Sequence, residues 1–200
     1  MRRPRRPGAT ALLLASVSLL SACMGTFETA RVVPLRIGGT FFRSLPSDGG
    51  VSMTGLFIEG GLPAGPGRFG AGLHAEITAS LGDRDRGIIG LWGVKLQLPG
   101  NPVLDIALGA DMWGYFPGEI KLILSRIVGP LEPYACLSAA TVITGDSDAP
   151  DQRGEGFLGL TAGIAAGLGR VSPWSLVLEV EGGPAWDSPG AGAGLFRVWP

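Results

Sequence analysis

The residues with the clearest capacity for chemistry in this sequence are its single histidine and a nearby glutamate. His74 is followed two positions later by Glu76. In a β-strand, residues two apart point to the same side, so this pair has the spacing of a general base and its partner. The sequence does not place a serine as their nucleophile. We therefore interpret both side chains as packed inside the protein, with a barrel-embedded hydrolase as the alternative.

Three aspartates form the second candidate site. Asp146, Asp148 and Asp151 carry carboxylate oxygens, which Ca²⁺ prefers, but their spacing differs from that of an EF-hand loop. The sequence also has no phosphate-binding loop, no cluster of metal ligands and no nucleophile elbow. We predict a protein without catalytic residues, metal or cofactor, in which these aspartates belong to a solvated loop.

The elements that hold these residues show a two-residue periodicity. Residues 103–113 read VLDIALGADMW, which places leucine, isoleucine and methionine on one parity and Asp105 and Asp111 on the other. Successive side chains of a strand point to opposite faces, so one face of this segment is apolar and the other carries two carboxylates. A helix would scatter the same residues around its surface. The pattern therefore predicts a strand.

The same alternation predicts about ten strands. They fall at residues 31–43, 51–61, 68–80, 87–98, 103–113, 119–128, 131–143, 155–168, 174–183 and 191–199. Short strands separated by Gly- and Pro-rich turns are typical of an antiparallel meander. The predicted loops at one end are residues 44–50, 81–86, 114–118, 144–154 and 184–190, and the predicted turns at the other end are residues 62–67, 99–102, 129–130 and 169–173. Bacterial membrane barrels have longer loops outside than inside, which assigns the first set to the cell exterior.

The composition indicates that the apolar face of these strands contacts lipid. Only 16% of the residues are charged, whereas soluble domains have about 25%. No stretch after residue 23 has the roughly 20 consecutive apolar residues of a membrane-spanning helix. The 34 glycines suit tight turns and a crowded barrel interior. We predict an all-β, antiparallel, up-and-down transmembrane β-barrel of about ten strands, with eight as the alternative.

The polar parity is expected to line the lumen. Its charged members are Arg36, His74, Glu76, Lys95, Asp105, Asp111, Glu119, Lys121, Glu179, Glu181 and Arg197. Unpaired charges inside a barrel are costly, so opposite signs should pair there. Closure places the last strand beside the first, and we expect Arg197 to lie near Arg36 and to be bridged by Glu179 or Glu181. Alternation alone does not identify the inner face, so a lipid-anchored, lipocalin-like soluble barrel with an apolar ligand pocket stays open.

The N-terminal residues have the features of a secretory leader. Four arginines within residues 1–7 precede an apolar run at residues 9–20. The stretch Leu20-Ser21-Ala22-Cys23 that follows resembles a bacterial lipobox. The resemblance implies cleavage before Cys23, a diacylglycerol thioether on its sulfur, and acylation of the new N-terminus by a chain such as palmitate. Cys136 then has no disulfide partner within the chain, and we expect it to be a buried thiol.

These features divide the chain into a signal peptide at residues 1–22, a lipidated connector at residues 23–30 and a barrel domain at residues 31–199. Cleavage leaves 178 residues with 12 basic and 17 acidic side chains, a balance that does not favour nucleic-acid binding. Met24 stands where an aspartate would imply retention in the inner membrane.

Together, the lipobox and the strands resemble small outer-membrane β-barrel lipoproteins of Gram-negative-type bacteria. The implied partner is membrane lipid, through the acyl chains on Cys23 and the barrel exterior, and no protein partner is identified. The expected role is structural or surface-interacting, without enzymatic activity, and the polar lumen is expected to be mostly plugged.

Overall fold

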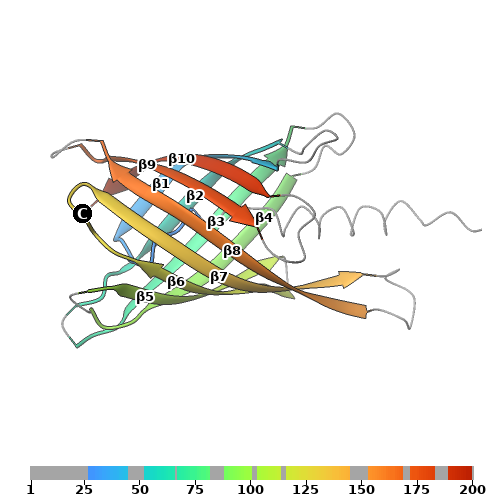
Figure 1. Ribbon diagram of the computed structural model, residues 1–200, viewed down its shortest axis with the longest axis horizontal. Helices are drawn as coiled ribbons and strands as arrows, with labels where there is room; N and C mark the ends of the chain where they lie inside the picture. Colours follow the sequence, from blue (N-terminus) through green and yellow to red (C-terminus); the bar gives the residue numbers. More distant parts are fainter. Residues whose placement is uncertain are drawn as a thin grey trace, which may run out of the picture.

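Ten strands close into a single antiparallel barrel (Figure 1). The computed structural model describes residues 27–44, 52–65, 67–81, 88–100, 103–113, 116–144, 153–168, 172–182 and 189–199. The strands are β1 (Leu35–Ser44), β2 (Ser52–Leu62), β3 (Gly70–Ser80), β4 (Ile88–Gln97), β5 (Asp105–Trp113), β6 (Phe116–Ser125), β7 (Leu131–Thr144), β8 (Arg153–Gly167), β9 (Trp174–Gly182) and β10 (Gly190–Trp199). The predicted all-β, up-and-down barrel is confirmed, with ten strands in the described residues.

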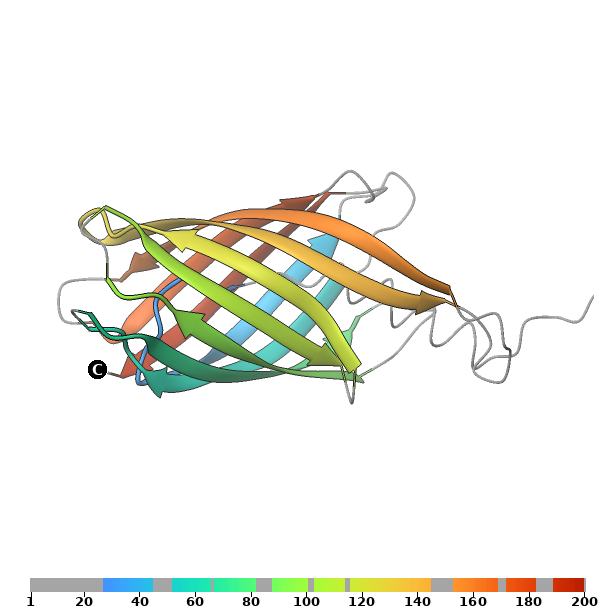
Figure 2. The same ribbon diagram turned by 90° about the horizontal axis from the view of Figure 1, so that it is seen from below.

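Pairing of the first strand with the last closes the barrel. β1 and β10 are antiparallel along their whole length, from Leu35 opposite Trp199 to Ser44 opposite Gly190. Every other strand pairs with its neighbours in sequence, and the strands cross the barrel obliquely (Figure 2). Closure gives each strand two partners around the barrel, so the barrel wall has no edge strand.

The barrel has two distinguishable ends. We call the end that holds Leu35 and Trp199 the turn end, and the end that holds Ser44 and Gly190 the loop end. Connections at the two ends differ less in length than the sequence predicts. The contrast comes instead from β7 and β8, which pair with each other over residues 141–144 and 153–156, beyond the last partners that β6 and β9 provide. This hairpin projects from the loop end (Figure 1).

Alternation along each strand separates an apolar outer face from the lumen. In β9 the outward Leu178 and Val180 are exposed, whereas the intervening Glu179 and Glu181 are each only 4% exposed. The same holds around the barrel, where large apolar side chains such as Leu56, Leu73 and Leu160 remain more than half exposed. Within the described residues, no helix is long and apolar enough to cross a membrane.

Two strands, β1 and β6, begin three or more residues away from their predicted starts. β1 starts at Leu35 instead of residue 31, because the residues before it turn into the lumen. β6 covers Phe116–Ser125 instead of residues 119–128. An irregularity in the pairing between Asp111 and Met112 brings Pro117 opposite Met112, so that the strand begins within the predicted turn.

Candidate functional site: the lumen and its N-terminal segment

The residues before β1 lie inside the barrel. Phe27, Glu28, Ala30 and Val32 are at most 2% exposed, and Thr29 is also buried. We call residues 27–32 the lumen segment. It contacts inward-facing side chains of strands on both sides of the lumen, through its backbone and through Glu28. The expected connector between lipid and barrel is therefore, from Phe27 onward, part of the filling of the lumen.

Glu28 is the centre of a buried ion-pair network. Its carboxylate lies 3.1 Å from His74 Nδ1, 3.7 Å from Lys95 Nζ and 3.5 Å from Lys121 Nζ. These three basic groups come from β3, β4 and β6, whereas Glu28 comes from the lumen segment. One carboxylate therefore joins the lumen segment to three strands of the barrel wall.

Wall carboxylates supply the remaining partners of the basic groups. Arg36 Nη2 lies 2.7 Å from Glu59 Oε2, and Lys95 also pairs with Glu59. Lys121 pairs with Asp111 and lies 3.8 Å from Glu119 Oε2.

The network balances charge. His74 lies between two carboxylates. Glu28 faces its Nδ1 and Asp111 faces its Nε2, so both N–H groups of an imidazolium have a partner. With His74 charged, the network contains four cations (Arg36, His74, Lys95 and Lys121) and four anions (Glu28, Glu59, Asp111 and Glu119). Buried charges are tolerated when each has an opposite partner, as here.

An aromatic cluster occupies the lumen beside this network. Phe57 and Phe196 meet edge to face with their centroids 5.7 Å apart, and the Arg36 guanidinium lies within 5 Å of both ring centroids. Such contacts between a cation and an aromatic face are favourable, most of all away from water. Phe27 of the lumen segment packs against Phe196. The lumen is therefore partly aromatic, which the prediction of a polar interior did not include.

Two glycines let inward-facing side chains of two strands meet over the strand that lies between them. Gly93 of β4 lies between His74 of β3 and Asp111 of β5, and the last two approach to 2.9 Å over it. Gly163 of β8 lies in the same way between Tyr134 and Glu179, whose oxygens are 2.6 Å apart. A Cβ atom at either glycine would collide with the side chains that cross it. These two contacts therefore depend on glycine at the strand between.

A Gly93→Ala variant is expected to be less stable by roughly 1–3 kcal/mol, the usual cost of overpacking a filled interior. The added methyl group would push the His74 ring away from Asp111. Denaturant unfolding in detergent micelles measures this difference. Gly90→Ala, in the same strand, is the matched control, because a Cβ there meets nothing within 4 Å. Equal stability of the two variants would contradict the packing described.

Most of the predicted lumen residues lie on the inner face. Arg36, His74, Lys95, Asp111, Glu119 and Lys121 belong to the network, and Glu76 accepts a hydrogen bond from Thr40 Oγ1 at 2.8 Å. Glu179 accepts hydrogen bonds from the Tyr134 hydroxyl and the Phe27 amide. Asp105 lies near the turn end beside Gln97. Glu181 is buried, but its Oε1 has no hydrogen-bond partner among the described residues.

Arg197 is the exception, and the expectation for it was wrong. It lies on the outer face with its guanidinium over the Trp199 ring, 4.8 Å from the centroid. Arg36 faces inward opposite Val198, and neither Glu179 nor Glu181 pairs with Arg197 in the described contacts. The residue that faces inward at this point of β10 is Phe196.

His74 and Glu76 do not form the acid–base pair considered from the sequence. Both ring nitrogens of His74 face other carboxylates, and its side chain is 1% exposed. A substrate would have to displace the lumen segment to reach the ring.

Glu28, His74 and Asp111 also place ligand atoms within 4.8 Å of one another, close enough for a metal site. The donor set does not fit one. A metal would use a single ring nitrogen, whereas the two carboxylates lie on opposite nitrogens, and Lys95 and Lys121 already bring positive charge to them. The three side chains are ion-pair partners. Two other candidate sites, Cys23 and the aspartates 146, 148 and 151, lie outside the described residues.

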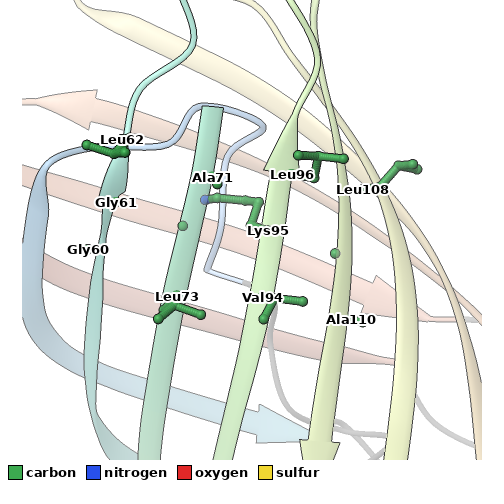
Figure 3. Close-up of a pocket in the computed structure, with 12 residues that line it drawn as sticks. Gly60, Gly61, Leu62, Ala71, Leu73, Val94, Lys95, Leu96, Leu108 and Ala110 are labelled. Atoms are coloured by element: carbon green, nitrogen blue, oxygen red, sulfur yellow. The ribbon is translucent and has the colours of Figure 1, made fainter. Parts of the chain in front are cut away.

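An apolar hollow of about 570 Å³ lies in the outer wall near the turn end (Figure 3). Leucines and a valine surround the small residues Gly60, Ala71 and Ala110. Lys95 also borders the hollow, but its ammonium group lies on the other side of the wall, in the lumen, where it pairs with Glu59. The hollow is thus continuous with the apolar outer surface and brings no polar chemistry of its own.

Comparison with solved structures finds several similar chains, and one of them is a bacterial β-barrel domain. The chain superimposes on the N-terminal β-barrel domain of Pseudomonas aeruginosa OprF with a TM-score of 0.38 and 13% sequence identity, over 84% of this chain and 99% of that domain. No protein-family model matches the sequence, and no curated protein matches it.

Proposed function

We propose that the protein is an outer-membrane β-barrel lipoprotein with a structural or surface-interaction role, whose lumen is closed by its own N-terminal segment. The observation that carries the proposal is the division of the strands into two faces. Large apolar side chains are exposed around the outside, and the charged network is buried within. Such a distribution is stable in a bilayer, whereas in water the exposed apolar belt would drive aggregation.

Contents of the lumen support the closed state. The lumen segment and the ion-pair network occupy the space through which ions would pass. A lipocalin-like function would require an apolar pocket inside, but Glu28, Lys95 and Lys121 are buried there. The projecting hairpin of β7 and β8 is the element best suited to contact a partner, since it extends beyond the wall at the loop end. Its sequence from residue 141 to 159 carries four acidic residues and one basic residue.

The anchor and the barrel are tested separately in one experiment. Cys23→Ser is expected to abolish incorporation of labelled palmitate, because the acylated thiol is lost. The variant barrel should still migrate differently on a gel before and after heating, and resist extraction by high salt, because its strands and not its anchor hold it in the membrane. Palmitate incorporation unchanged by Cys23→Ser would refute the lipoprotein assignment. Release of the variant by salt would refute the membrane barrel.

A further inference from the structure

The direction of the lumen segment can be read from its contacts. At one end, the Val32 amide donates a hydrogen bond to Gln97 Oε1 at 2.9 Å, and Gln97 is the last residue of β4, at the turn end. At the other end, the Phe27 amide donates to Glu179 Oε2 at 2.8 Å. Followed from β1 towards the N-terminus, the chain therefore enters the lumen at the turn end and proceeds towards the loop end.

Phe27 lies in the half of the lumen that is nearer the loop end. Its ring packs against Gly192 and Gly194 of β10, a strand that begins at the loop end with Gly190. Two to four residues of strand correspond to about 7–13 Å. Cys23 lies four residues before Phe27, and four extended residues span at most about 14 Å. The loop end is therefore within reach of Cys23.

The way back to the turn end is occupied. Glu28 fills the middle of the lumen with its three basic partners, and Ala30, which is fully buried, donates its amide to Ser125 Oγ at 3.2 Å. A chain that reversed at Phe27 would have to pass these buried groups to return to the turn end.

We propose that the chain before Phe27 leaves the barrel at the loop end, so that Cys23 and its acyl chains join the lipid leaflet at that end. The path of the chain through the lumen does not depend on the proposed function. The acylation of Cys23 and the identity of the leaflet do rest on the proposed function. The anchor and the projecting β7–β8 hairpin then lie on the same side of the membrane. If the projecting hairpin marks the outer end, as the longer connections of outer-membrane barrels do, that side is the cell surface.

The test uses the full-length protein in Gram-negative cells. A short flexible epitope is inserted between Gly25 and Thr26, which leaves the lipobox and Met24 intact and lengthens the chain ahead of Phe27. Two control variants carry the same epitope between Ser147 and Asp148, at the loop end, or after Gly100, at the turn end. Antibody binding is compared in intact and permeabilised cells. We expect the N-terminal epitope to be accessible from the same side as the loop-end control.

Accessibility shared with the turn-end control would overturn the inference, and so would absence of the epitope from the mature protein on a denaturing blot. The other assignments fail in different ways. If the loop-end and N-terminal epitopes both require permeabilisation, the membrane orientation is reversed but the threading stands. If palmitate is not incorporated while the N-terminal epitope follows the loop-end control, the acylation fails and the path of the chain stands.

Discussion

A Glu28→Ala variant is expected to conduct ions across a planar bilayer, whereas the wild-type protein is expected to be silent. Glu28 is the only side chain of the lumen segment that pairs with three basic residues of the wall in the described contacts. Its removal leaves those buried cations undercompensated, a change that typically costs 3–5 kcal/mol. Escape of the lumen segment and entry of water relieves that cost, and the vacated lumen becomes a pore.

Single-channel recording measures the conductance, and denaturant unfolding in lipid vesicles measures the accompanying loss of stability. Arg31→Gln is the matched control, because Arg31 belongs to the lumen segment but has a 43% exposed side chain, and its one ion-pair partner in the described contacts is Glu132 at 4.0 Å. An exposed pair of this kind contributes at most about 1 kcal/mol, so the control should remain silent and stable. A silent Glu28→Ala variant with control-like stability would show that the network does not hold the lumen segment.

A Leu178→Arg variant is expected to lower the stability of the barrel in lipid vesicles by about 2–4 kcal/mol. Leu178 lies in the middle of β9 and is 47% exposed on the outer face. A charge at that depth must sit in hydrocarbon or distort the bilayer to reach water. The free energy of unfolding from urea titration in vesicles gives the difference.

The control for this substitution places the same charge at the end of the barrel instead of the middle of a strand. Val128 is also exposed on the outside, but it lies in the connection between β6 and β7 at the turn end. An arginine there reaches the interface, so Val128→Arg is expected to cost no more than about 1 kcal/mol. If the two variants were equally stable, the outer face would be in contact with water along its whole height.

Alternation made most of the fold predictable. Leu178, Glu179, Val180 and Glu181 differ so clearly in polarity that their two faces can be assigned from sequence, and each strand that repeats the pattern adds to the same barrel. Prediction was weaker where polarity does not alternate. The first residues of β10 are glycine and alanine, which suit either face, so Arg197 was assigned by its charge alone. Near the end of a strand, an arginine can lie outside against Trp199 and reach the interface.

The centre of the lumen was the least predictable part. Glu28 precedes the first strand, and no periodicity connects it to His74, Lys95 or Lys121. Glu59 was also missed, although it shares its parity with the inward-facing Phe57. Closure of the barrel brings these residues together across the lumen, and a linear pattern contains no information about contacts between opposite walls.

Oxygen and nickel-chelate accessibility of spin labels along β9 tests the central claim, that the apolar face contacts lipid and the charged face fills the lumen. Labels are placed singly at positions 177–181 in a Cys136→Ala background and measured in bilayers. We predict that labels at positions 178 and 180 are relaxed by oxygen and not by the water-soluble chelate, and that those at 177, 179 and 181 are shielded from both. Strong relaxation of labels 178 and 180 by the chelate would contradict this orientation.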